Sequence, residues 1–278
     1  MPLRERDRPV ALSGSALDQL ANTCSLQWFL GREVKADAPP TAAQGFGNVV
    51  HVLADEVASG RTPADLAVLM ERLDSVWDAI GFDAPWKSAQ EKENARAALE
   101  RFLRWHVMER GGRTPVATEH AFDVVLKTDD GYQVRVRGSM DRVEADADGH
   151  AYVVDFKTGK GPVSARDVAR HPQLAVYQRA VEEGAVDGLF GGTRPRAGGA
   201  ELVQLRQGAA KKDGGDTLPK VQAQEPLSEG RGVDRRAARR GGRPGPGGAV
   251  RPRPGRHCQH CSFRASCTAR PEGRQVVE

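Results

Sequence analysis

An apolar run, Tyr152-Val153-Val154, ends in two charged residues that stand one residue apart, Asp155 and Lys157. Side chains two apart on a β-strand point to the same face. The carboxylate and the ammonium group would therefore lie side by side at the end of a buried strand. A plain ion pair is one interpretation, and a metal site with a lysine directed at its substrate is the other.

A second carboxylate, Asp141, follows Gly138 on the strand predicted to precede the one that carries Asp155. In a hairpin the two carboxylates would face each other across neighbouring strands, and a divalent cation would relieve their repulsion. Oxygen ligands favour Mg²⁺ or Mn²⁺. His51, on a predicted helix, would add a nitrogen ligand and shift the preference toward Mn²⁺. Glu119, on the first predicted strand, would join this site or support it from just outside.

Lys157 has a chemical role beside such an ion. An ammonium group can hold the attacking water or neutralise charge that develops on a phosphate. Metal-activated water, in-line attack and charge neutralisation together hydrolyse a phosphodiester. Gln173 and Tyr177 are four residues apart on the next predicted helix and share a face, where they would hydrogen-bond phosphates or Lys157. Each residue alone also fits a structural role, but their combination in this order favours the chemical one.

The cysteines form a second candidate metal site, and there are four of them: Cys24, Cys258, Cys261 and Cys267. The last three make a C-x2-C-x5-C pattern, in which the two-residue gap lets both sulfurs turn toward one ion. Four thiolates suit a [4Fe–4S] cluster or a zinc ion equally well. His257 and His260 offer zinc a cysteine–histidine alternative that leaves Cys24 as a buried apolar thiol.

The elements that must position these residues follow a simple order. Apolar residues recur at helical spacing in four stretches, residues 17–30, 43–60, 63–80 and 89–110. Short alternating or β-branched runs follow at 117–128, 132–138, 139–146 and 150–157. A helix is predicted over 164–184 and a strand over 201–206. This order predicts an α+β fold with a central mixed sheet, built from an antiparallel meander of four strands and flanked by helices.

The net charge of +4 comes from one segment. Residues 231–256 hold nine arginines against the single acid Asp234 and contribute +8, so the rest of the chain sums to −4. The basicity is therefore local and says little about the folded part. This Gly/Pro/Arg composition favours neither helix nor strand, and we interpret the segment as disordered or as a frame-shifted reading of a GC-rich gene.

Four segments are predicted along the chain. They are a disordered N-terminus over 1–10, a core with an N-terminal helical part over 11–206, a disordered or frame-shifted segment over 207–256, and a cysteine cluster over 257–278. No apolar run approaches the roughly 20 residues that a membrane span needs. The first residues do not have the pattern of a signal peptide. We expect a cytoplasmic protein without membrane contact.

Together these residues resemble the PD-(D/E)XK nuclease superfamily, in its RecB-like branch. That branch carries a helix histidine, a G-x-x-D-R stretch, a D-x-K strand and a Q-x-x-x-Y helix. The corresponding residues here are His51, Gly138 to Arg142, Asp155 to Lys157, and Gln173 to Tyr177. The chain is similar to the C-terminal nuclease domains of actinobacterial helicase–nucleases of the AdnA/AdnB type, to AddB and to the CRISPR adaptation exonucleases.

The resemblance implies a restriction-endonuclease-like fold and a role for each site residue. His51, Asp141 and Asp155 would ligate Mg²⁺ or Mn²⁺ together with the Phe156 carbonyl, and Lys157 would be catalytic. The relatives bind a [4Fe–4S] cluster through one upstream cysteine and a C-x2-C-x5-C pattern. The resemblance therefore favours an iron–sulfur cluster over zinc at the four cysteines.

The implied function is that of a metal-dependent DNA exonuclease in double-strand break processing and recombinational repair. It would act on single-stranded DNA ends beside a helicase subunit or motor domain, since this chain has no G-x-x-x-x-G-K-[S/T] loop for ATP. The alternative is a catalytically silent, metal-stapled module that binds single-stranded DNA, or a detached helicase–nuclease fragment. The relatives also have an ordered, partly helical segment where this chain has its Arg/Gly/Pro tract.

Overall fold

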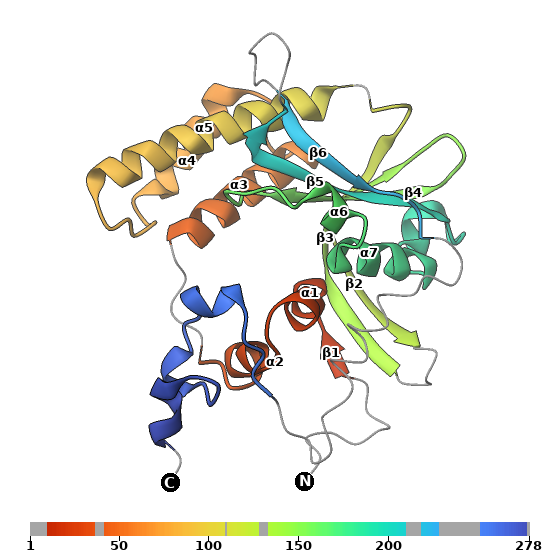
Figure 1. Cartoon of the computed structure of the whole chain (residues 1–278). Coiled ribbons are helices and arrows are strands. Elements are labelled where there is room, and N and C mark those ends of the chain that lie inside the picture. The colour runs from red at the N-terminus through yellow and green to blue at the C-terminus, as the bar shows by residue number, and fades with distance from the viewer. Residues whose placement is uncertain are drawn as a thin grey trace.

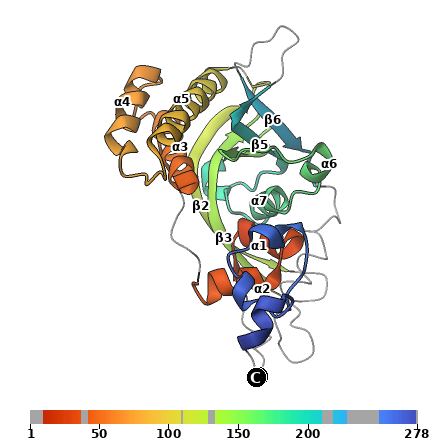
Figure 2. The same ribbon diagram turned by 60° about the vertical axis from the view of Figure 1, so that its left-hand side comes forward.

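Helices cover both faces of a single six-stranded sheet. The structure is a computed structural model, and it describes residues 10–36, 42–108, 110–127, 133–209, 218–227 and 251–276. Helices α3, α4 and α5 lie on one face of the sheet, and α1, α6 and α7 lie on the other (Figures 1 and 2). The predicted α+β class, with a mixed sheet between helices, is confirmed.

The sheet contains parallel and antiparallel neighbours in the order β1-β3-β4-β5-β6, with β2 on β3. Its strands are β1 (Val10–Leu12), β2 (Thr114–Lys127), β3 (Gln133–Ala145), β4 (Ala151–Lys157), β5 (Ala197–Gly208) and β6 (Pro219–Gln224). Strands β2, β3 and β4 form an antiparallel meander. β5 runs parallel to β4, β6 is antiparallel to β5, and β1 runs parallel to β3.

The meander has three strands, so the prediction of separate strands on either side of Gly138 is wrong. β3 runs unbroken through this glycine, which is paired with Phe122 of β2. A Cβ at Gly138 would lie 3.4 Å from the Phe122 ring. The glycine therefore makes room for an aromatic side chain on the neighbouring strand, and it does not form a turn.

The helices are α1 (Gly14–Asn22), α2 (Ser25–Trp28), α3 (Ala42–Ala58), α4 (Leu66–Trp77), α5 (Pro85–Val107), α6 (Ala165–Val168) and α7 (Pro172–Glu182). Two stretches predicted as single helices are each divided. The first divides at Cys24, which is extended and caps α2. The second divides before Pro172, because proline has no N–H to continue a helix but suits the first helical position.

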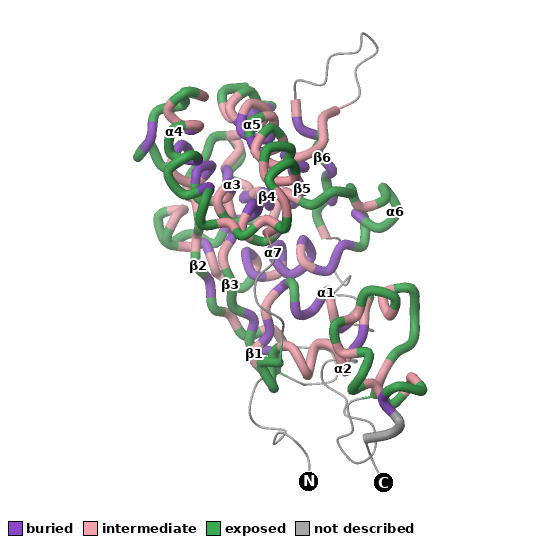
Figure 3. Tube along the Cα trace, turned by 90° about the vertical axis from the view of Figure 1, so that its left-hand side faces the viewer, coloured by how far each residue is buried: buried purple, intermediate pink, exposed green. Residues whose placement is uncertain are grey.

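Two apolar clusters hold the layers together, one on each face of the sheet. Along β4, Val153 faces the cluster that contains α1 and α7, whereas Val154 and Phe156 face the cluster of α3, α4 and α5. This alternation follows from the period of two along a strand. Figure 3 shows the buried stretches along the sheet and α7, with exposed segments outside them.

Strand β6 contradicts the prediction that ordered structure ends near residue 207. Its inward residues, Gln222 and Gln224, are buried. They are polar, so the apolar pattern by which a strand is recognised is missing. The expectations for residues 1–9 and for most of the Arg-rich tract, 228–250, lie outside the described residues. Among the described helices, none combines the length and the apolar character that a membrane span requires.

Candidate active site and cysteine pocket

The site lies where β3 and β4 separate. The last ladder pair between these strands joins Arg142 to Val154, and Asp141 and Asp155 occupy the next positions along each strand. The Asp141 carboxylate accepts a hydrogen bond from the backbone N–H of Phe156 at 2.7 Å. Both carboxylates therefore stand at the diverging end of a hairpin, where a third group can approach between them.

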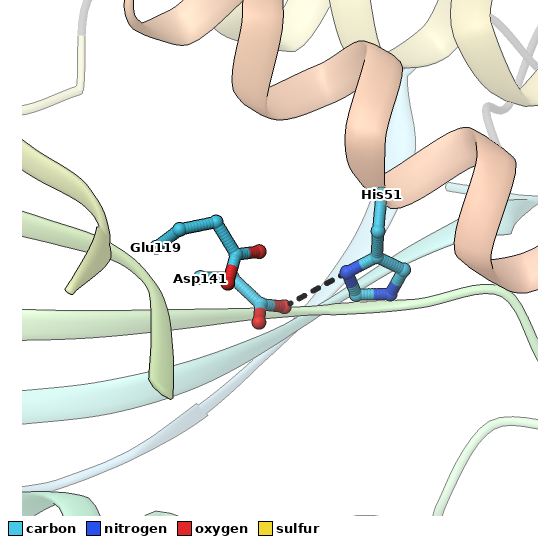
Figure 4. A group of neighbouring side chains, drawn as sticks. All are labelled: His51, Glu119 and Asp141. Carbon is cyan, nitrogen blue, oxygen red and sulfur yellow. Dashed lines mark ion pairs between the residues drawn. The ribbon is translucent and has the colours of Figure 1, made fainter. Parts of the chain in front are cut away.

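Three potential metal ligands converge at this point from three elements. His51 of α3, Glu119 of β2 and Asp141 of β3 each place a ligand atom within 4.8 Å of the other two. His51 Nδ1 lies 3.4 Å from Asp141 Oδ2. Figure 4 shows the imidazole and the two carboxylates turned toward one another. One nitrogen and two carboxylate donors form a set that suits Mn²⁺ or Mg²⁺.

A glycine lets α3 come close enough to deliver its histidine. Gly47 lies one helical turn before His51, and a Cβ at Gly47 would be only 2.9 Å from Thr158 Oγ1. Thr158 directly follows β4. A larger residue at position 47 would have to displace the Thr158 side chain or move α3, which carries His51, away from the end of this strand.

Glu119 is held in an unusual backbone conformation. Its φ of 44° lies in the left-handed region, which residues with a side chain rarely adopt, and it does so in the middle of β2. Ser139 Oγ donates a hydrogen bond to Glu119 Oε2 at 2.9 Å. Such strain persists only where the surrounding structure enforces it, and it gathers at functional sites. Nothing in the sequence singles out Ser139, because one serine on a strand carries no distinguishing signal.

Four other predicted site residues form a closed ring of contacts. Lys157 Nζ lies 2.6 Å from Asp155 Oδ2 and donates to Gln173 Oε1 at 2.9 Å. Gln173 Nε2 donates to the Tyr177 hydroxyl at 2.8 Å, and this hydroxyl donates to Asp155 Oδ1 at 3.2 Å. The ring holds the Lys157 ammonium group between the Asp155 carboxylate and the Gln173 amide oxygen, at the end of β4.

The observed grouping differs in part from the ligand set that the resemblance implies. His51 and Asp141 come together with Glu119, whereas Asp155 belongs to the neighbouring ring. Phe156 contributes its N–H to Asp141. Asp155 Oδ2 is buried and, among the described residues, has no hydrogen-bond partner of good geometry despite its proximity to Lys157. This oxygen therefore keeps a lone pair for a further ligand, as a metal site would require.

The electrostatics of the site favour an additional positive charge. Burial raises the pKa of Asp141 well above its usual range, and the nearby Asp155 carboxylate raises it further. Burial lowers the pKa of His51, so its imidazole is kept neutral with a lone pair free to bind metal. Burial, followed by the charge of Asp155, raises the pKa of Tyr177, which keeps its hydroxyl a donor.

Arg142 follows Asp141 in the chain, but its side chain belongs to a different network of contacts. Its guanidinium is buried, donates to Glu144 Oε1 at 2.8 Å and contacts His106 Nδ1 at 3.0 Å. Glu144 also accepts from Arg110 Nε at 3.0 Å. This buried network ties β3 to the end of α5. Among the described residues, the polar contacts of the Arg142 side chain are thus with Glu144 and His106 and not with the neighbouring Asp141.

The four cysteines line one pocket, although one comes from the start of the chain and three from its end: Cys24, Cys258, Cys261 and Cys267. In Figures 1 and 2 the C-terminal segment lies beside α2, which begins immediately after Cys24. Ser25 Oγ donates to the backbone carbonyl of Arg251 at 2.9 Å, which joins the two ends directly. The four thiols are thus gathered around one pocket, but no three of these described cysteines have sulfur atoms that all lie within 4.8 Å of one another.

A short strap reaches the pocket before the C-terminal cysteines. Residues 252–255 read Pro-Arg-Pro-Gly, and the prolines have no N–H to donate. The Arg253 N–H donates to Cys24 Sγ, and the Gly255 N–H donates to Cys258 Sγ, each at 3.3 Å. Both N–H groups of the strap therefore point at cysteine sulfurs. This is the end of the tract that we expected to be disordered or frame-shifted.

One histidine adds a further donor to the pocket. His257 lines it, and the His257 Nε2 atom is buried without a hydrogen-bond partner among the described residues. His260 is not among the described residues that line the pocket. A buried polar atom without a partner is uncommon in folded proteins and is consistent with an absent ligand. Four thiols and one imidazole fit either an iron–sulfur cluster or zinc.

Parts of the chain are similar to known proteins. It is 27% identical over 184 residues to a subunit of the ATP-dependent helicase/deoxyribonuclease of Streptococcus mutans. This alignment covers 63% of the chain but only 17% of that relative. The solved structure of SSO0001 shares 16% identity, with a TM-score of 0.42, over 96% of this chain and 89% of that one.

A family match extends over nearly the whole described core. Residues 11–268 match the PD-(D/E)XK nuclease superfamily. The matched region contains the helix histidine, both hairpin aspartates, the D-x-K strand, and all four cysteines. The mixed sheet with helices on both faces is the restriction-endonuclease-like arrangement predicted from the sequence. The chain therefore belongs to the PD-(D/E)XK nuclease superfamily.

Proposed function

We propose that this chain is a metal-dependent deoxyribonuclease that hydrolyses phosphodiester bonds during DNA repair. The observation that carries the proposal is the convergence of His51, Glu119 and Asp141 beside the ring that holds Lys157. Membership of a nuclease superfamily supports the reaction class. Ion pairs that only stabilise a fold do not require a buried carboxylate with a raised pKa beside a second carboxylate.

The metal ligands are proposed from the donor set. His51, Glu119 and Asp141 would hold Mg²⁺ or Mn²⁺, and Asp155 would complete the set through Oδ2, the oxygen that faces Lys157 Nζ. When bound, the ion would polarise the phosphate and lower the pKa of a bound water. The Phe156 carbonyl, which the resemblance adds to the ligands, is part of the same proposal.

The protein's own groups would then act on the phosphate. Lys157 lies beside Asp155 with its ammonium group partly exposed, so it can neutralise charge on a non-bridging oxygen or hold the attacking water. Gln173 and Tyr177 hold the side chains of Lys157 and Asp155 in position through hydrogen bonds. Their role is to keep the ammonium group directed toward the acidic residues.

The test is hydrolysis of end-labelled single-stranded DNA with Mn²⁺ or Mg²⁺, and with a chelator. We expect Lys157→Ala and Asp155→Ala to lose roughly 100-fold or more in rate, because the first removes a group that stabilises developing charge and the second removes a proposed metal ligand. Lys160→Ala is the matched control, since Lys160 stands three residues later with an exposed side chain. Full activity of Lys157→Ala, or wild-type cleavage that survives the chelator, would refute the assignment.

The substrate and partner are proposed from the relatives. The Streptococcus mutans relative is named for both helicase and deoxyribonuclease activities. We propose that this chain acts as an exonuclease on single-stranded ends, with a helicase subunit or motor domain at its side. Circular single-stranded DNA tests this point: it should resist a strict exonuclease, and its cleavage would indicate an endonuclease. Binding of single-stranded DNA without any degradation would instead indicate the silent binding module.

The cysteine pocket is proposed to hold a [4Fe–4S] cluster. Four thiols line one pocket, and the strap supplies N–H donors to two of the sulfurs, as is common around iron–sulfur clusters. Anaerobically purified protein should be brown and contain iron and sulfide, and Cys24→Ser should be pale. Colourless wild-type protein with one equivalent of zinc would favour the zinc alternative, for which His257 is the additional candidate ligand.

A further inference from the structure

Helix α1 begins in direct contact with the side chain that holds Lys157. A Cβ at Gly14, the first residue of α1, would lie 3.1 Å from Gln173 Cγ, and 3.7 Å from both Gln173 Cα and Cβ. Gly14 is buried, and its φ is outside the left-handed region. The backbone conformation at position 14 therefore does not require glycine, but the space beside it is too small for a Cβ unless a neighbour shifts. The preceding Ser13 caps the helix by accepting from the Ala16 N–H at 3.1 Å.

Gln173 is not free to move away from an added atom. Its amide oxygen accepts from Lys157 Nζ at 2.9 Å, and its amide nitrogen donates to the Tyr177 hydroxyl at 2.8 Å. Tyr177 in turn is buried and bonded to Asp155. A long side chain usually yields at little cost, but here both polar ends of the amide are engaged. A movement of Gln173 Cγ must therefore either move Lys157 as well or break one of these hydrogen bonds.

We propose that Gly14 is a positioning residue that sets the place of the Lys157 ammonium group through Gln173. The glycine lets α1 approach α7 until the backbone of α1 rests against Gln173, which limits where this side chain can move. The proposal rests on the proposed function in giving Lys157 a role in catalysis. Gly14 has no contact with the reacting groups and acts only through its neighbour.

The first test is the Gly14→Ala variant. We expect kcat to fall roughly tenfold with KM little changed, because displacements of well under 1 Å at a reacting group carry penalties of this order. Thermal stability should change little, since the better helix propensity of alanine and the loss of one hydrogen bond at Gln173 are each about 1 kcal/mol and oppose each other. A purely structural role predicts the reverse, a change in stability with kcat unaltered.

Gly45→Ala is the matched control. It adds the same Cβ to another helical glycine, 3.2 Å from Ile80 Cγ2, at a contact that does not involve Gln173. Gly45 lies on α3, which also carries His51, so the readout of this control is the rate at which Lys157 is acetylated by acetic anhydride and not kcat. We expect this rate to equal that of the wild type. An equal rise of the rate in Gly45→Ala and Gly14→Ala would overturn the proposal, because the effect would then belong to tight helical glycines in general.

A double substitution separates positioning from general damage. Gln173→Ala removes the Cγ atom that an alanine at position 14 would meet, so in that background Gly14→Ala should have no further effect on kcat. If the two losses multiply instead, Gly14 does not act through Gln173, and the proposal is wrong.

A measurement without DNA keeps this inference separate from the nuclease assignment. The rate at which acetic anhydride acetylates Lys157, followed by mass spectrometry, reports whether the amine is held. Gly14→Ala should raise this rate about fivefold, the equivalent of one lost hydrogen bond of about 1 kcal/mol. An unchanged rate overturns the positioning role. If wild-type protein cleaves no DNA yet the acetylation rate responds, only the proposed function has failed.

Discussion

At the scale of single residues, the site combines two costly features. Glu119 adopts a left-handed backbone conformation within a strand, and Asp141 is a buried carboxylate beside a second one. Each feature lowers the stability of the metal-free protein, and each directs an oxygen toward His51. Natural sites often retain such strain where function requires it. The sequence could predict the acidic residues and their shared face, but it could not predict the backbone conformation of Glu119.

Replacing Asp141 should therefore stabilise the metal-free protein. The pKa of Asp141 is raised in the folded state, so the folded protein binds its proton more tightly than the unfolded chain. Stability is then lost as pH rises from the usual carboxyl value of 3.8 through the raised pKa. Asparagine does not titrate and keeps an acceptor for the Phe156 N–H. Asp141→Asn should unfold at a higher temperature than wild type at neutral pH, in the presence of a chelator.

The pH series is the decisive part of this experiment. The stability difference between Asp141→Asn and wild type should grow with pH across the titration window and then level off. Glu71→Gln, an exposed carboxylate on α4, serves as the control and should leave the curve unchanged. A difference that stays constant at every pH would show that the aspartate is not the source of the dependence.

At the scale of elements, α7 is held in place by buried glutamines. Gln224 Nε2 donates to the carbonyls of Val168 and His171 at 3.0 and 3.2 Å. Gln178 Nε2 donates to Gln224 Oε1 at 3.0 Å. Strand β6 therefore fastens the turn between α6 and α7, and so fixes where α7 presents its Gln173 and Tyr177.

Strands β4 and β6 differ in how well their sequences predict them. β4 is predicted over 150–157 and is observed over Ala151–Lys157, because a run of β-branched residues ends at charged ones. β6 is not predicted because two of its buried residues are glutamines, whose partners are backbone carbonyls of distant turns and the side chains of other glutamines. Local periodicity reports apolar burial, and it has no means of reporting burial that polar contacts satisfy.

Gln224→Leu tests this role of β6. Leucine has a similar size but removes the hydrogen bonds that the Gln224 amide makes to the Val168 and His171 carbonyls and to Gln178. This loss should lower the free energy of unfolding by about 1–3 kcal/mol. Urea denaturation measures the change. Lys220→Ala, at an exposed position of the same strand, is the control. Equal stabilities of the two variants would mean that these hydrogen bonds contribute nothing.

At the scale of the whole molecule, the cysteine pocket joins segments more than 200 residues apart in sequence. The strap and Ser25 add direct contacts between these segments. A metal centre bound by all four thiols would close a very long loop and restrict the unfolded chain, a contribution of order several kcal/mol. The spacing in the sequence is enough to group the last three cysteines. Their approach to Cys24, however, depends on how the core between them folds.

Cleavage of the chain between Cys24 and the C-terminal cysteines would test whether a metal links these two segments. We would insert a specific protease site after Arg240 and cleave it in the purified, metal-loaded protein. The fragment that carries residues 251–278 should co-elute with the rest in gel filtration, because the metal bridges the two pieces. It should separate after chelation or in a Cys24→Ser background. Co-elution that survives both treatments would show that the contacts of the strap suffice without metal.

The placement of the four thiols also has a consequence for synthesis in the cell. Cys24 leaves the ribosome 243 residues before Cys267, an interval of roughly 10 to 50 s at ordinary rates of translation. For that time the first thiol has no partner, while α1, which precedes it, already has an apolar face to bury. Assembly of the proposed metal centre would therefore follow translation, and oxidation of Cys24 during the delay would prevent it.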